Sequence, residues 1–174
     1  MRFSLTADHK EFFVKNRYIE FEGLLTADEA APLQANLSEG RDLWRHSPGI
    51  KKIVHKRQLA SVAAQLSDRK QLRLAFDQAG SLSSPLSLEQ ISCLKPLVIA
   101  LVLKRDGGGI FFSSALPLST LFQDKGESFF LIAYGANKIQ YLLEKQDPYV
   151  HVLKRQGLVF GDLLSPATHP FLCR

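Results

Sequence analysis

The stretch "PLVIALVLKRDGGGIFF", residues 96–112, constrains the fold more than any other part of this sequence. Every residue from Leu97 to Leu103 is apolar, which is typical of a β-strand that is covered on both faces. The glycines that follow allow a tight turn, because glycine adopts a positive φ without a steric penalty. Since a second apolar stretch comes directly after them, we predict a β-hairpin over residues 98–115 inside a layered sheet.

The sequence before this hairpin has a mainly helical pattern. Thr6 is placed to cap a helix over residues 5–16, and the alternating residues 17–23 are typical of a half-buried strand. Thr26 and Glu29 have the spacing of a capping box, with which a second helix is expected to begin. We therefore expect the order helix, strand, helix at the start of the chain.

A longer helical region is expected at residues 48–67. Apolar residues recur there at three-to-four spacing and form one buried stripe, namely Ile50, Ile53, Val54, Val62, Ala63 and Leu66. Basic residues lie mostly off this stripe and form a basic surface, namely Lys51, Lys52, Lys56 and Arg57. Such a run is usually a solvated helix face, and its alternative role is contact with nucleic acid or another acidic partner. No aromatic residues are interleaved to stack on bases, and the net charge of +5 permits such contact without requiring it.

After residue 68 the pattern changes to strands separated by turn residues. Strands are expected at residues 71–78, 96–104, 110–116, 128–135, 149–154 and 157–164, whereas residues 136–145 fit either an extension of a strand or a helical turn. Helices followed by antiparallel strands predict an α+β fold, in which the N-terminal helices cover the outside of a β-sandwich or barrel. No domain boundary is visible, so we expect one domain, with residues 1–67 mainly helical and residues 68–174 mainly β.

The composition is that of an ordinary globular chain. Hydrophobic residues make up 45% of the sequence and charged residues 22%, which excludes an intrinsically disordered chain. Cys93 and Cys173 lie in apolar surroundings without a metal-binding spacing, so we expect reduced thiols and a cytoplasmic location. The sequence shows no secretory signal pattern and no apolar run of the ~20 residues that a membrane helix needs.

Three stretches resemble the phytanoyl-CoA dioxygenase-like family of Fe(II)/2-oxoglutarate oxygenases. The first is "LTADHKEFFVKNRYIEFEGLLTADEAAPLQANL", residues 5–37, which is similar to that family's opening helix, strand and capped helix. The second is "KRQGLVFGDLLSPATHP", residues 154–170, and the third is the hairpin at residues 96–112. The resemblance covers about half of the chain and implies a double-stranded β-helix, or jelly roll.

The resemblance also implies an iron site, and the sequence lacks part of it. Such enzymes hold Fe(II) with two histidines and one carboxylate. The family's His-x-Asp or His-x-Glu is expected between Leu72 and Lys95, where this sequence has no histidine. The pair His9 and Glu11 has the right spacing, but both residues lie in the first predicted helix, where residues two apart point to different sides.

The remaining candidates for a metal site come from the part of the chain after residue 68. The resemblance implies His169 as the distal metal ligand and Arg174 as the residue that binds 2-oxoglutarate. His151 alternates with valines in its predicted strand, so it faces the interior if those valines face outward. A rearranged site of His151, His169 and one carboxylate, with Asp77 as the candidate, is therefore an alternative. Further carboxylates in this part of the chain are Glu89 and Asp162, of which Asp162 is more typical of a turn.

Three functions follow from these observations. The leading hypothesis is a divergent jelly-roll protein that has lost the iron triad and binds a small molecule or a protein. The second is an active oxygenase that uses Fe(II) and 2-oxoglutarate with relocated ligands. The third is a module that binds nucleic acid or another acidic partner through residues 51–57. Because a fold does not determine a function, the site residues must decide among them.

Overall fold

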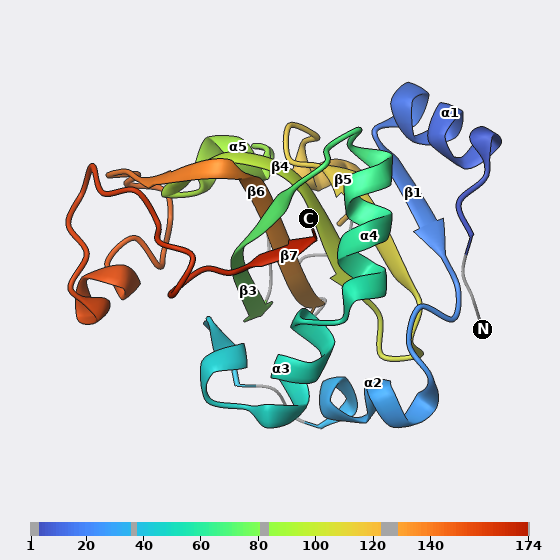
Figure 1. Ribbon diagram of the computed structural model, residues 1–174, viewed down its shortest axis with the longest axis horizontal. Coiled ribbons are helices and arrows are strands. Elements are labelled where there is room, and N and C mark those ends of the chain that lie inside the picture. Colours follow the sequence, from blue (N-terminus) through green and yellow to red (C-terminus); the bar gives the residue numbers. More distant parts are fainter. Residues whose placement is uncertain (1–3, 36–37, 81–83, 123–128, 174) are drawn as a thin grey trace.

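The structure, a computed structural model, describes residues 4–35, 38–80, 84–122 and 129–173. A seven-stranded antiparallel sheet lies at its centre, in the order β1-β5-β4-β6-β3-β2, and β7 pairs with β3 (Figure 1). The strands are β1 (Tyr18–Phe21), β2 (Gly40–Arg41), β3 (Leu72–Gly80), β4 (Leu94–Leu103), β5 (Gly109–Ser113), β6 (Phe129–Tyr141) and β7 (Phe171–Cys173). The α-helices are α1 (Ala7–Asn16), α2 (Ala27–Gln34), α3 (Pro48–Val54), α4 (Arg57–Leu66) and α5 (Leu88–Ile91), and the 3-10 helices are η1 (Leu43–Arg45), η2 (Leu118–Thr120) and η3 (Val152–Gln156).

The predicted hairpin is confirmed as β4 and β5. These strands pair antiparallel from Ile99 opposite Ser113 to Leu103 opposite Gly109. The turn needs glycine at Gly107, which has φ +89 and where an added Cβ would lie 2.5 Å from the carbonyl oxygen of Leu25. The hairpin turn is therefore fitted against the segment that leads into α2.

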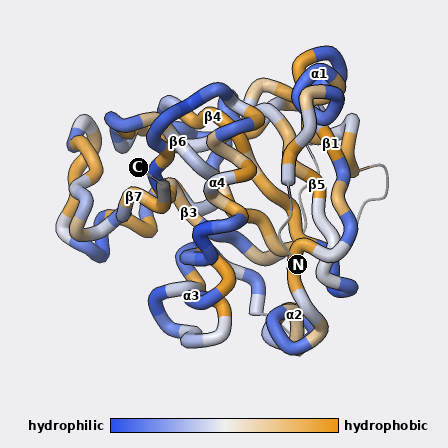
Figure 2. The backbone as a smooth tube through the Cα atoms, turned by 45° about the vertical axis from the view of Figure 1, so that its right-hand side comes forward, coloured by the Kyte–Doolittle hydropathy of each residue, from blue (hydrophilic) through white to orange (hydrophobic). Residues whose placement is uncertain are grey.

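Two apolar layers cover the sheet. Buried residues of α1 to α4 pack on one face, which confirms that the N-terminal helices lie on the outside of an α+β fold. Figure 2 shows hydrophobic and hydrophilic stretches within both α2 and α3, as expected of helices that cover a core with one side only. The opposite face is covered by α5, η2, η3 and the C-terminal segment that follows β6. None of the helices in the described part of the chain is long and apolar enough to cross a membrane.

The helical region at residues 48–67 is two helices rather than one. Ser47 caps α3, whose first residue is Pro48, and the backbone becomes extended at Lys56 before α4 begins. The Lys56 ammonium donates to the carbonyl oxygen of Leu24 at 3.3 Å and pairs with Glu29 at 2.5 Å. The break places Lys56 against the start of α2, while the whole predicted apolar stripe remains buried.

The two strands expected at residues 149–154 and 157–164 were predicted wrongly. Residues 152–156 form η3, and β6 instead takes up residues 136–141, which the sequence left open. Asp147 Oδ1 accepts the backbone N–H of Tyr149 at 2.9 Å, and this turn ends any extended run. Val150 and Leu153 are three residues apart and are both buried against the sheet, whereas a strand would bury every second residue.

Candidate functional site

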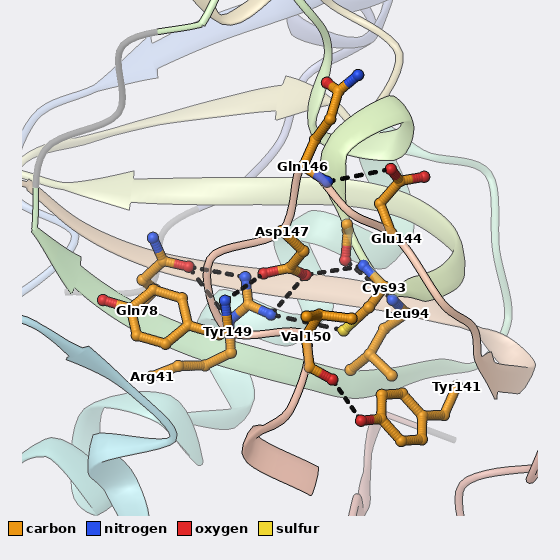
Figure 3. Close-up of polar contacts among 11 residues, drawn as sticks. Arg41, Gln78, Cys93, Leu94, Tyr141, Glu144, Gln146, Asp147, Tyr149 and Val150 are labelled. Atoms are coloured by element: carbon orange, nitrogen blue, oxygen red, sulfur yellow. Dashed lines mark hydrogen bonds and ion pairs between the residues drawn. The ribbon is translucent and has the colours of Figure 1, made fainter. Parts of the chain in front are cut away.

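A pocket of about 300 Å³ opens on the face of the sheet opposite α1 to α4. Its polar wall includes Arg41, Gln78 and Asp147, and its apolar wall includes Leu88 and Ile91. These residues come from β2, β3, α5 and the segment after β6, so the pocket forms only when distant parts of the chain meet. Figure 3 shows the polar side chains pointing toward one another.

Arg41 is the centre of the polar wall. It lies opposite Gln78 in the β2–β3 register, and its Nε and Nη2 donate to Gln78 Oε1 at 3.2 and 2.9 Å. Its Nη1 donates to Asp147 Oδ2 at 2.8 Å and to Cys93 Sγ at 3.8 Å. The Arg41 side chain is 7% exposed and that of Asp147 is 1% exposed, so this is a buried ion pair.

Two aromatic rings hold the Arg41 guanidinium. Its central carbon lies 4.0 Å from the ring centroid of Phe76 and 4.9 Å from that of Tyr149. A guanidinium is planar and weakly hydrated, so it stacks on aromatic faces while its N–H groups bond in its own plane. These contacts fix the orientation of the Arg41 guanidinium and therefore the position of its charge.

Asp147 connects this network to the C-terminal segment. Its Oδ2 also accepts the backbone N–H of Cys93 at 2.8 Å, and its Oδ1 accepts that of Tyr149. Burial alone would raise the pKa of Asp147, but the charge of Arg41 and these hydrogen bonds outweigh it and hold the pKa below its ordinary value. Asp147 is therefore a carboxylate that joins β2, the start of β4 and the segment after β6.

Cys93 is a buried free thiol at the edge of this network. Burial and the neighbouring Asp147 carboxylate raise the pKa of Cys93 to about 12, although Arg41 opposes this shift. Because the thiolate is the reactive form of cysteine, this side chain is unreactive at neutral pH.

His169 lies in the turn before β7 rather than on a strand. It is fully buried, its Nδ1 lies 2.9 Å from Thr168 Oγ1, and its Nε2 has no hydrogen-bond partner among the residues that the structure describes. Burial, together with the nearby charges of Arg45 and Arg73, lowers the pKa of His169 to about 3. The imidazole is therefore neutral, and its neighbours are cations.

Asp77 lies on the other face of β3 from Gln78. Its Oδ2 and Oδ1 accept the backbone N–H groups of Leu43 at 3.0 Å and Trp44 at 3.3 Å, so it caps η1. The pKa of Asp77 is raised to about 7, mainly by burial, against the opposing hydrogen bond from Trp44 and with a smaller rise from the nearby Asp42 carboxylate. By holding η1, Asp77 also holds β2, the strand that carries Arg41.

The metal ligands that the sequence nominated are not brought together. His151 is exposed and its ring lies 6.1 Å from that of Phe160, whereas Asp77 and His169 have the separate surroundings given above. Arg174 lies outside the described residues. All five histidines lie within the described ranges, yet no three His, Cys, Asp or Glu side chains in those ranges form a group that could hold a metal ion. The residues that the structure describes do not fit an iron triad, because it needs three such donors on one face.

The basic surface is only partly available. Lys51, Lys52 and Arg57 are exposed, whereas Lys56 is bound to Glu29. Lys56 is partly buried at the α3–α4 junction through its ion pair, which the run of basic residues in the sequence does not indicate.

Sequence reasoning missed Arg41, Gln78 and Asp147. The available signal was the Asp-Pro pair at residues 147–148, which is typical of a turn that an aspartate side chain stabilises. Nothing in the sequence near Arg41 marks it as buried, because its partners are 37 and 106 residues away.

Among the comparisons with known proteins, matches were found among solved structures, and these matches concern the fold. No model of a known protein family matches the chain, and no curated protein matches it in sequence. The non-heme alpha-ketoglutarate-dependent carbocyclase SnoK from nogalamycin biosynthesis is 12% identical with a TM-score of 0.72, over 96% of each chain. The epimerase SnoN, solved with Fe3+ and alpha-ketoglutarate, is 12% identical with a TM-score of 0.70, over 94% of this chain and 96% of that one.

A third solved structure, CT296 from Chlamydia trachomatis, is 25% identical with a TM-score of 0.57. The match covers 78% of this chain and 98% of CT296. Together with the antiparallel sheet and its outer helices, the neighbours show that this chain has the α+β jelly-roll fold of 2-oxoglutarate oxygenases. At these identities the likeness concerns the fold and leaves the chemistry of the site to its own residues.

Proposed function

We propose that this chain is a small-ligand-binding protein built on the oxygenase jelly roll, and that its ligand site is the pocket beside Arg41. One observation carries the proposal. Polar side chains from β2, β3 and the 146–149 segment converge on a pocket, while the described residues provide no group of three metal donors. Ligand sites are typically concave, mainly preformed, and lined by apolar residues with a few positioned polar groups.

The likeness to the phytanoyl-CoA dioxygenase-like family belongs to this proposal. It is supported by the three sequence stretches at residues 5–37, 96–112 and 154–170, and each of them has described residues that contribute to the fold. In this proposal the protein is a divergent relative of that family that binds a small ligand and does not act as an oxygenase.

The alternative is an active oxygenase with relocated ligands, which the fold of SnoN and SnoK favours. An Fe(II) ion bound beside 2-oxoglutarate would supply oxygen activation there. We expect His169 to be unsuitable for it, since the side chains of Arg45 and Arg73 place positive charge near its ring. A metal cation next to two cations is electrostatically disfavoured.

The test is metal content and turnover of the whole chain. The protein is incubated anaerobically with Fe(II), desalted, and analysed for iron by mass spectrometry; succinate formation from 2-oxoglutarate is measured in parallel. We expect far less than one iron per chain, no succinate, and no change on His169→Ala. One tightly bound iron per chain with succinate formation, both lost in His169→Ala, would instead establish the oxygenase.

A further inference from the structure

The charge on the pocket wall is opposite to that of a 2-oxoglutarate site. Arg41 is the cation that lines it, and four of its five N–H groups are directed at Gln78, Asp147 and Cys93. An arginine binds a carboxylate best through two parallel N–H groups. Because these groups are occupied and the charge is balanced by Asp147, Arg41 offers an incoming anion neither a free edge nor net charge.

Glu39 gives the pocket its uncompensated charge. It lines the pocket, and no salt bridge joins it to any residue in the described ranges. Its side chain lies against Gly80, where an added Cβ would come within 2.9 Å of Glu39 Cγ and 3.0 Å of Oε1. The Glu39 side chain therefore lies against the end of β3, while the residue remains exposed to solvent.

The Glu39 charge also acts on Tyr149, another residue of the pocket lining. Burial raises the pKa of Tyr149, and the Glu39 charge raises it further. Both residues line the pocket. Counting Arg41, Asp147 and Glu39, the pocket carries one net negative charge.

We propose, on the basis of the proposed function, that this pocket selects a small organic cation: an amine whose ammonium group pairs with Glu39 and whose alkyl part lies on Leu88 and Ile91. A volume of about 300 Å³ lies at the small end of the range for ligand sites, so the ligand is small. Leu88 and Ile91 belong to the apolar layer of this face, and they provide the surface that an alkyl chain covers. A dicarboxylate such as 2-oxoglutarate would meet the Glu39 charge without a free cation to offset it.

Four probes of similar size separate charge from shape: pentylamine, which is an ammonium ion at pH 7, pentan-1-ol, pentanoate and 2-oxoglutarate. Each is titrated into the isotopically labelled whole chain, and the backbone amide signals of Gln78, Ile91 and Gln146 are followed by NMR. We expect pentylamine to bind roughly tenfold more tightly than pentan-1-ol, a difference of about 1.4 kcal/mol. The two anions are expected to bind more weakly than the alcohol.

The variant Glu39→Gln removes the charge and keeps the size of the side chain. It is expected to abolish the difference between pentylamine and pentan-1-ol. Glu11→Gln changes an exposed glutamate on α1 and is the matched control, in which the difference should persist. Unchanged amide spectra of both variants without probe establish that they are folded.

The other outcomes decide between the two proposals. Equal binding of amine and alcohol, or preference for either anion, would overturn the cation selectivity while leaving the pocket as a ligand site. If no probe shifts these signals at millimolar concentration while the spectrum shows a folded protein, the ligand site itself is refuted, and the inference with it.

Discussion

The variant Asp147→Asn tests whether the buried ion pair organises the pocket and the C-terminal segment. Asparagine has nearly the same shape, but it lacks the charge and one of the two acceptor oxygens. The Arg41 guanidinium would remain 7% exposed without its carboxylate, and one of the N–H groups now bound by Asp147 would lose its acceptor. Both consequences follow from the exchange of one carboxylate oxygen for an amide nitrogen.

The expected loss of stability is large. Removing one partner of a buried ion pair typically costs about 3–5 kcal/mol, because the remaining charge stays buried and unpaired. For a chain of this size, about 1 kcal/mol shifts the melting temperature by about 2–4 °C, so the melting temperature should fall by roughly 6–20 °C. Urea denaturation at pH 7 measures the free energy of unfolding directly.

A matched control is available a few residues away. Glu144 pairs with Lys95 at 3.2 Å, but these side chains are 23% and 31% exposed, so Glu144→Gln should cost less than about 1 kcal/mol. In addition, the double variant of Arg41→Met with Asp147→Asn should lose less than the sum of the two single losses. The reasoning is refuted if Asp147→Asn costs no more than Glu144→Gln, or if the two losses simply add.

Three further predictions concern stability and protonation. Asp77 has a pKa raised to about 7 in the folded state, so the native chain holds a proton that the unfolded chain releases near pH 3.9. The free energy of unfolding should therefore fall as the pH rises toward 7. In urea titrations from pH 5 to 8, Asp77→Asn should flatten this dependence, and parallel curves for the two proteins would contradict the prediction. The ring signals of His169, whose pKa is lowered to about 3, should not titrate by NMR between pH 8 and 5, and a midpoint near 6.5 would show that the ring is not buried among cations. Gly107→Ala should destabilise more than Gly157→Ala, because both glycines have positive φ (+89 and +83) but an added Cβ meets the Leu25 carbonyl only at Gly107; equal thermal shifts would mean that backbone strain alone matters.

The apolar pattern was sufficient to predict much of the fold. The hairpin of β4 and β5 and the caps at Thr6 and Thr26 depend on neighbours in sequence, and both caps are present. The same reasoning failed at residues 149–164, where alternating valines looked like a strand. There Asp147 accepts the backbone N–H of Tyr149 in a turn, and it also pairs with Arg41, 106 residues away, which no local pattern indicates.

The site was less predictable than the fold, for a physical reason. A family resemblance matches residue positions in the sequence, whereas a site depends on which side chains come together in the folded chain. His169 could be aligned with a metal ligand, but its surroundings are set by Arg45 and Arg73, which come from other elements. Gln78 looked like an ordinary strand residue and became part of the pocket only through its register opposite Arg41.

The arginines near His169 also oppose the binding of a metal ion at that ring. Arg73 donates to the carbonyl oxygens of His169, Asn137 and Leu164, and Arg45 donates to that of Thr168. These bonds tie the C-terminal segment to β3 and η1. A metal ion at His169 would need carboxylates where these guanidinium groups now lie, and exchanging them would leave buried carbonyl groups without donors. The positive charge that opposes a metal is therefore the same charge that holds this end of the fold in place.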